Sequence, residues 1–338
     1  MAAFTTDMTG YMAATVFYSL VTALVVEALI RIWSIHRPST RFKFRLLVLF
    51  LPLLYWPAFL LAFPQRQGDV FRQGAALLNL KQWLDLPVAG TMPFRYGLLL
   101  LLASTTLLFL AQELAPTLHT CLARRHRQES RRMEKGQHPG LHAALAEVSQ
   151  KMGRPAPPVL VADRQAPAVY VAGAANPTLV ISSHLLEALD GDELRGVLAH
   201  ELAHLRRRDS WWGWALLVIR VLMFYNPVAL LVSRQLVQDN EQACDDVAVS
   251  ATGQPLAFAA GLIKAFQAEK PESPAKAQGR SGNLRSRASA MYDHASLATV
   301  KKRVARLLNP PPVEDSPYEN IRLVVVSSML AVLLFFVV

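Results

Sequence analysis

The sequence has few charged residues and almost no cysteine. Only 18% of its 338 residues are charged, whereas 52% are hydrophobic and the mean hydropathy is +0.25. Two cysteines, Cys121 and Cys244, exclude a disulfide framework of the kind that stabilises small secreted proteins. The scarcity of charge excludes an ordinary soluble domain, and it predicts membrane segments together with one domain of moderate size.

Four apolar runs are predicted to be membrane helices, because each is close to the length of about 20 residues that a span requires. Three of them lie within residues 1–115, and the fourth ends the chain. They cover residues 11–33, 46–63, 96–114 and 321–338. The sequence therefore predicts a mainly α-helical membrane protein with four transmembrane helices.

The distribution of lysine and arginine predicts the orientation of these helices. The formal net charge is +10, and the cations are clustered in the connection 31–45 and in residues 124–132. Cytoplasmic loops are enriched in Lys and Arg, so both segments are expected in the cytoplasm and both chain ends outside. Basic runs beside membrane helices more often meet anionic lipid than nucleic acid, so no direct nucleic-acid contact is expected.

Residues 116–320, between the third and fourth apolar runs, are predicted to form a cytoplasmic α+β domain. A helix is expected at 141–152, and residues 268–290, rich in Lys, Arg, Ser, Pro and Gly, are predicted to form a mobile loop. A small sheet is expected from three short apolar stretches at 159–161, 168–171 and 179–181.

His200, Glu201 and His204 form the pattern H-E-x-x-H. Residues four apart share one face of a helix, so both imidazoles could bind one metal ion. Asp190 and Glu193 are placed to form a capping box at the start of this helix. The pattern is typical of zinc peptidases. The alternative is a buried amphipathic helix that carries two histidines by chance.

A catalytic zinc site needs a third protein ligand. The metzincin pattern would require glycine at 207 and histidine at 210, where this chain has Arg207 and Ser210, so that pattern is excluded. Glu241 is the next candidate. Asp245, four residues later on the same helical face, could orient a ligand histidine. The alternative is an exposed acidic start of a helix.

The segment 211–232 is apolar and long enough to span a membrane, yet it separates the two histidines from Glu241. If all three residues bind one ion, both ends of the segment lie on one side of the membrane, which excludes a single crossing. Asn226-Pro227 predicts a break. We therefore expect two short helices that fold back, buried in the domain or dipping into the membrane interface.

Taken together, these motifs resemble the BlaR/MecR family of membrane-embedded zinc metallopeptidases, which includes β-lactam-sensing antirepressors. The resemblance rests on residues 200–209, on Asn226-Pro227 and on residues 241–245. HtpX and CAAX-prenyl proteases share the H-E-x-x-H and E-x-x-x-D patterns and are the nearest alternatives. The resemblance implies a zincin-like (gluzincin) domain on the cytoplasmic face of a multi-pass protein of the bacterial inner membrane.

We also expect distinct roles for individual residues. Glu201 would act as general base, Asp245 would orient a ligand histidine, and Asp209 would support the helix or the site. The ligands of Zn²⁺ would be His200, His204 and Glu241. The candidates for stabilising an oxyanion are Tyr170, His184, His294 and Arg303. Arg303 lies in a short basic amphipathic stretch, for which lipid contact is the favoured alternative.

The implied function is an endopeptidase that cleaves a cytoplasmic or membrane-proximal protein, such as a repressor or itself, during signalling, and that could form a homo-oligomer. No Ser-x-x-Lys sensor domain is expected within these residues, which makes the link to β-lactams and antibiotic resistance weak. One alternative is a housekeeping quality-control peptidase like HtpX. Another is a non-catalytic receptor or scaffold with structural zinc, but such a site gains nothing from Glu201.

Overall fold

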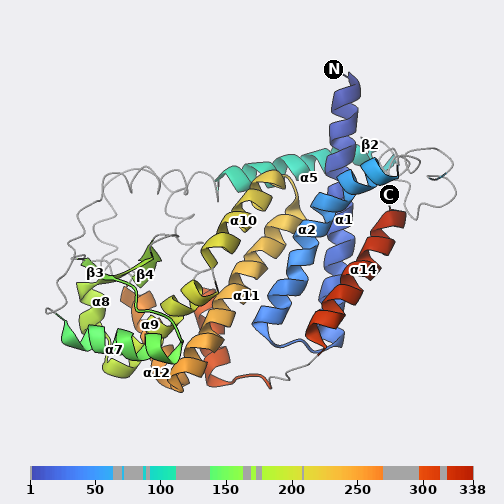
Figure 1. The fold of residues 1–338 in the computed structure, drawn as a ribbon. Helices are drawn as coiled ribbons and strands as arrows, with labels where there is room; N and C mark the ends of the chain where they lie inside the picture. The colour runs from blue at the N-terminus through green and yellow to red at the C-terminus, as the bar shows by residue number, and fades with distance from the viewer. Residues whose placement is uncertain are drawn as a thin grey trace, which may run out of the picture. The chain divides into compact units, whose positions relative to one another are not determined.

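The computed structural model describes ten stretches of the chain, which fall into two compact units (Figure 1). We call residues 1–125, 215–240 and 313–338 the helical unit, and residues 126–214 and 241–312 the sheet unit. The described residues are 2–63, 71, 87–88, 92–111, 138–162, 169–172, 177–207, 209–268, 297–312 and 318–337.

Three long apolar helices form the centre of the helical unit. They are α1 (Ala2–Ile32), α2 (Pro38–Ala62) and α14 (Glu319–Val337), which lie side by side in Figure 1. Stretches of 23, 22 and 19 residues in these helices are long and apolar enough to cross a membrane. The predicted mainly helical architecture is confirmed, with three candidate spans among the described residues.

The predicted third span coincides with α5 (Phe94–Phe109), which follows a short antiparallel pair of strands, β1 (Pro87–Val88) and β2 (Met92–Pro93). At 16 residues, α5 is shorter than the other three candidates. Residues 112–114, which the sequence assigned to the same span, lie outside the described residues. A fourth span therefore stays a prediction.

The apolar segment 211–232 contributes to two helices, α10 (Asp209–Leu222) and α11 (Pro227–Thr252). The break between them falls at Asn226-Pro227. The Asn226 side-chain oxygen accepts hydrogen bonds from the backbone N–H groups of Val228 (3.0 Å) and Ala229 (3.2 Å), which caps α11. The second helix is not short, since it is 26 residues long and carries Glu241. Association of the segment with the membrane stays a prediction.

Buried polar side chains fix the turn before α11 to α1. Asn226 Nδ2 donates to Ser19 Oγ at 2.9 Å, and the Tyr225 and Thr15 hydroxyls lie 2.8 Å apart. All four side chains belong to buried residues. A buried polar group without a hydrogen bond is costly, so these pairs favour one placement of the turn on α1.

Two arginines at the start of α2 form ion pairs inside the helical unit. Arg45 Nε lies 2.7 Å from a carboxylate oxygen of Glu27 on α1. Arg45 also binds Asp239 of α11, and Arg41 Nη2 lies 2.9 Å from the same Asp239 carboxylate. Helix α2 therefore begins at Pro38 rather than at the predicted residue 46, because part of the basic connection is helical and contacts its neighbours.

The sheet unit contains three strands, β3 (Val159–Ala162), β4 (Val169–Ala172) and β5 (Thr178–Ser182). Their order is β3-β5-β4, with β3 parallel and β4 antiparallel to the central β5. The predicted sheet is confirmed, and each strand end lies within one residue of its expected position. Its buried residues share a core with α7 (Pro139–Lys151), α8 (Ser183–Ala188), α9 (Gly191–Arg206) and α12 (Pro255–Ala268) (Figure 1).

The predicted capping box at the start of α9 is confirmed. The Asp190 carboxylate accepts hydrogen bonds from the backbone N–H groups of Asp192 (3.0 Å) and Glu193 (2.8 Å). The Glu193 carboxylate accepts one from the backbone N–H of Asp190 at 2.9 Å. These bonds satisfy donors that the first helical turn leaves unpaired, so they define where α9 begins.

The helical pattern that the sequence shows after Glu241, to about residue 266, is divided between α11 and α12. Gly253 has φ +70°, a conformation that favours glycine and ends α11, and Pro255 begins α12. Helix α12 approaches α9 closely, since a Cβ at Gly196 would lie 2.9 Å from the Cα of Phe258. The predicted mobile loop 268–290 lies, apart from residue 268, outside the described residues.

Replacing Asp239 with alanine is expected to destabilise the helical unit by about 3 kcal/mol, because Arg41 and Arg45, whose side chains are only 19% and 13% exposed, would lose the buried carboxylate that they share. The matched control is Glu319→Ala, which removes the partner of Lys43, whose side chain is 45% exposed. That variant is expected to lose less than about 1 kcal/mol. Reversible unfolding of the purified protein in detergent measures both changes, and equal losses would contradict the prediction.

Candidate metal centre

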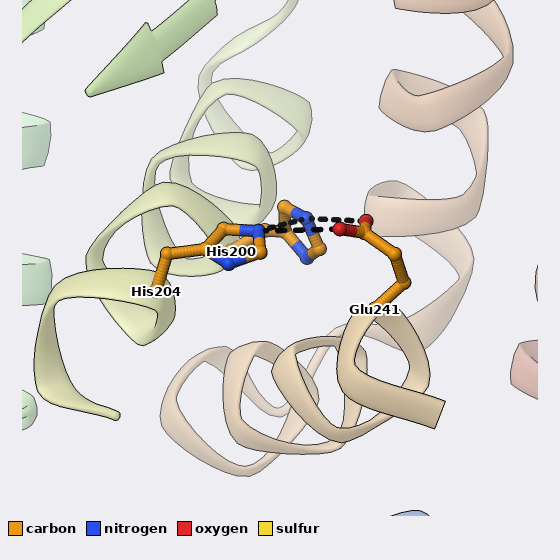
Figure 2. A group of neighbouring side chains, drawn as sticks. All are labelled: His200, His204 and Glu241. Atoms are coloured by element: carbon orange, nitrogen blue, oxygen red, sulfur yellow. Dashed lines mark hydrogen bonds and ion pairs between the residues drawn. The ribbon is translucent and has the colours of Figure 1, made fainter. Parts of the chain in front are cut away.

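Three side chains from two helices meet within the sheet unit. His200 and His204 lie on α9 and Glu241 on α11, and Figure 2 shows both imidazoles beside the Glu241 carboxylate. The two Nε2 atoms are 3.2 Å apart. The Glu241 oxygens lie 3.5 Å from His200 Nε2 and 3.7 Å from His204 Nε2. The structure thus brings together the three residues expected to bind zinc.

These separations fit one tetrahedral ion. Ligand atoms about 2.0–2.1 Å from a tetrahedral Zn²⁺ lie about 3.3 Å from one another. In this chain the two Nε2 atoms are 3.2 Å apart, Glu241 Oε2 lies 3.5 Å from His200 Nε2, and the other oxygen, Oε1, lies 3.7 Å from His204 Nε2. Two imidazoles and one carboxylate are also a donor set of catalytic zinc sites, which keep a fourth position open. The residues therefore fit Zn²⁺ as ligands.

Asp245 lies behind the first histidine. Its Oδ1 atom is 3.0 Å from His200 Nδ1, so the carboxylate can fix the orientation of the ring while Nε2 stays available to a metal. Burial opposes ionisation of Asp245, but hydrogen bonds from His200 and Arg303 outweigh it and lower the pKa of the carboxyl group. This geometry supports the expected orienting role.

Arg303 connects Asp245 to Glu241. Its Nε and Nη2 atoms donate to the Asp245 carboxylate at 2.8 and 2.6 Å, and Nη1 lies 3.1 Å from a Glu241 oxygen. Arg303 is 8% exposed, so the expected contact of this residue with lipid is wrong. A buried carboxylate, Asp245, and a half-buried one, Glu241, require a positive partner, and helix 297–308 turns its arginine inward to supply it.

The neighbouring charges set the protonation of the site. Burial alone would raise the pKa of Glu241, but its hydrogen bond with His200 and the nearby cations lower that pKa to about 2. Burial would lower the pKa of His200, yet its bonds to Asp245 and Glu241 raise it to about 9. Burial raises the pKa of Glu201, partly offset by the charge of His200. A carboxylate with a raised pKa is better suited to accept a proton.

The candidate ligands and Glu201 line a pocket of about 440 Å³. Tyr170, an expected oxyanion candidate on β4, lines the same pocket. His184 is exposed on α8 and is not among the lining residues, so the structure does not bring this candidate to the site. His294 lies outside the described residues. Asp209 is the first residue of α10, and its supporting role stays a prediction.

Sequence reasoning missed two features of the site. One is the contact of Arg303 with both Asp245 and Glu241. The other is the apolar part of the pocket, to which Phe258, Leu262 and Phe266 contribute from α12. Their spacing of four residues is visible in the sequence, but the same spacing is typical of any helix face that packs into a core.

Comparison with known protein families shows to which family the chain belongs. Residues 83–291, more than half of the chain, match the family described as BlaR1 peptidase M56. The chain belongs to this family. It is a family of membrane metallopeptidases, and the resemblance to it seen in the sequence is confirmed. The matched residues include His200, Glu201, His204 and Glu241 but end before Arg303.

Curated relatives named "Protease HtpX homolog" are also similar to this M56 chain. The relative from Acidiphilium cryptum (strain JF-5) is 32% identical over 160 residues, which cover 37% of this chain and 55% of the relative. The relative from Thermococcus sibiricus (strain DSM 12597 / MM 739) is 24% identical over 173 residues, which cover 40% and 59%. The chain therefore spans between half and two thirds of the length of these relatives.

Replacing Asp245 with asparagine is expected to weaken zinc binding by about 10- to 100-fold, because His200 would lose the carboxylate that orients it. Asp246→Asn is the matched control. Asp246 is the next residue of α11 and its side chain is 39% exposed, paired with Arg306 instead of a histidine. Competition between the zinc-loaded protein and a chelator measures both affinities. Equal affinities for the two variants would exclude the orienting role.

Proposed function

We propose that this M56 protein is a membrane-embedded, zinc-dependent endopeptidase. The observation that carries the proposal is the geometry of the candidate centre, where His200, His204 and Glu241 lie within reach of one ion. Glu201 lines the pocket into which these ligands open. Three protein ligands beside a pocket are typical of a catalytic zinc site, whereas a structural site is closed by four. This favours catalysis over a non-catalytic receptor or scaffold.

Each residue of the centre has a distinct part in peptide hydrolysis. A Zn²⁺ ion bound by His200, His204 and Glu241 would supply Lewis acidity and lower the pKa of water. Glu201 takes the proton of the attacking water and passes it to the leaving amine. Asp245 holds the His200 ring, while Tyr170 is a candidate donor to the oxyanion.

Strand β4 offers a means of holding an extended substrate. Within the described sheet β4 pairs only with β5, and its residues Val169 and Tyr170 line the pocket. A peptide added beside β4 would bind through its main chain, and this mode of binding does not demand one particular sequence. The arrangement therefore suits a protein substrate.

We further propose a multi-pass protein of the bacterial inner membrane, with α5 as a fourth span beside α1, α2 and α14. The clustered cations favour a cytoplasmic sheet unit and external chain ends. A repressor or the chain itself as substrate, a signalling role and a homo-oligomer are proposals that rest on the family alone. Quality control of membrane proteins is the second candidate, supported by similarity to proteins named HtpX.

Two substitutions separate metal binding from catalysis. Glu201→Gln is expected to retain zinc but to lower the cleavage rate by about 10²- to 10⁴-fold, because no general base would remain. Glu241→Ala is expected to lose the metal together with activity. Zinc content and cleavage of an unfolded protein substrate are measured on the purified chain in detergent, with the exposed Glu187→Gln on α8 as control.

Each variant tests the role of a different residue. Zinc retained in full by Glu241→Ala would show that the third ligand lies elsewhere. Unchanged cleavage by Glu201→Gln would exclude this residue as general base. Cleavage of many unrelated misfolded membrane proteins by the wild type would favour the quality-control role over a dedicated signalling role.

A further inference from the structure

We infer that one end of the helical unit binds the headgroup of an anionic phospholipid. At this end α1 stops and both α2 and α14 begin, so the ends of the three candidate spans lie together (Figure 1). Lys43 of α2 and Glu319 of α14 form an ion pair of 2.7 Å there. The Arg322 guanidinium of α14 lies over the ring of Trp33, which follows α1, at 5.3 Å from the ring centroid. Such binding rests on the membrane location of these helices and not on peptide cleavage.

Cations outnumber acidic groups at this end of the unit. Residues 31–45 contain no Asp or Glu, and Glu319 is the acidic residue in the first turn of α14. The Asp239 carboxylate binds two of the arginines of α2, and Glu319 binds Lys43. These pairs leave a net positive charge, to which Arg31, Arg37 and Arg322 contribute.

Two of these arginines border the turn between α1 and α2. Arg31 lies in the last turn of α1, Arg37 directly precedes α2, and both are exposed. The connection between the two helices is short, residues 33–37, so it holds both arginines at the same end of the unit. A guanidinium group can donate two parallel hydrogen bonds to the oxygens of one phosphate. The turn is therefore suited to a phosphate group.

The surroundings of the turn have the composition of a membrane interface. Trp33 packs edge-to-face on Phe44 of α2, with ring centroids 6.2 Å apart and ring planes inclined by 76°. Ile32 beside it is 73% exposed, and Tyr318 directly before α14 is exposed as well. Tryptophan and tyrosine are enriched where membrane helices leave the hydrocarbon region, at the level of the lipid headgroups. We therefore expect the cations to meet headgroups rather than bulk water.

Helix α14 offers an apolar surface that begins at the same end. Its exposed apolar residues follow the spacing i, i+4, i+8, i+11 and i+15, which places them on one face of the helix. They are Ile321, Val325, Met329, Val332 and Phe336. An acyl chain can lie along this face while its phosphate stays beside the cations. A free phosphate ion or a nucleic acid would gain nothing from the face, so the two features together favour a lipid.

The excess of cations favours a lipid with a net negative charge. Phosphatidylglycerol is anionic, whereas phosphatidylcholine balances its phosphate with a choline cation. Each Lys or Arg near a membrane surface favours anionic lipid by about fivefold. Arg31 and Arg37 together are therefore expected to give a preference of at least about tenfold.

Titration of the delipidated full chain in a neutral detergent tests this binding. Phosphatidylglycerol and phosphatidylcholine with identical acyl chains are the probes, and native mass spectrometry measures how much of each stays bound. The wild type is expected to bind phosphatidylglycerol at least about tenfold more tightly than phosphatidylcholine. The double variant Arg31→Gln/Arg37→Gln is expected to lose this preference and to bind phosphatidylcholine as the wild type does.

Matched variants control for charge and for folding. Lys301→Gln/Lys302→Gln removes the same charge from two exposed residues of helix 297–308 in the sheet unit, and it is expected to keep the wild-type preference. Arg31→Lys/Arg37→Lys keeps the charge at the turn and is expected to restore binding. Unfolding temperature without lipid reports whether each variant folds. If Arg31→Gln/Arg37→Gln does not fold, Arg322→Gln takes its place, with an expected loss of about fivefold for phosphatidylglycerol.

Three outcomes would overturn the inference. The first is equal binding of the two lipids by the wild type. The second is an equal loss of preference in both glutamine double variants, since binding would then follow net charge alone. The third is full displacement of phosphatidylglycerol by an equal concentration of glycerol phosphate, which would assign the cations to a soluble phosphate compound. Lipid binding is measured without a peptide, so its absence would leave the proposed peptidase intact, and an absence of cleavage would leave the lipid site intact.

Discussion

The metal centre depends on one buried ion pair, between Arg303 and Asp245. Burial alone would raise the pKa of a carboxylate at this depth, because it disfavours the charged form. The guanidinium donates two hydrogen bonds to it and keeps it ionised, so Asp245 can accept from His200 Nδ1 and leave Nε2 for a metal. The same arginine contacts Glu241. Removing the charge of Arg303 would therefore disturb two of the three candidate ligands, although Arg303 is not a ligand itself.

The two structural units fix their helices by different kinds of interaction. In the helical unit, the Asn226 cap and the charges around Asp239 join α11 to α1 and α2. Hydrogen bonds and ion pairs require particular distances and directions, so these contacts define the position of the helix more narrowly than apolar packing alone. In the sheet unit, the contact of Gly196 with Phe258 brings α12 against α9. Close packing there sets both the position of His200 and the wall of the pocket.

Much of the fold and of the candidate centre could be predicted from the sequence, because the signals are local. The H-E-x-x-H pattern, the capping box of Asp190 and the three strands each depend on neighbouring residues. The end of α11 at Gly253 and Pro255 also had a local signal, but the apolar periodicity on both sides obscured it. The burial of Arg303 and the ion pairs of Arg41 and Arg45 could not be predicted, since basic residues near apolar runs are usually exposed and only tertiary contacts reveal their partners. The pocket wall was hidden for a similar reason, because α12 has the pattern of an ordinary core helix.

Helix 297–308 has a consequence for the assembly of the sheet unit. Two arginines on one face of this helix, Arg303 and Arg306, bind the consecutive residues Asp245 and Asp246 of α11. In thermodynamic terms the helix can be treated as an internal ligand, a segment held by complementary charge on a surface that an earlier part of the chain provides. Its docking equilibrium and the integrity of the metal centre are thermodynamically linked, because the arginine that completes the centre arrives with the docked helix.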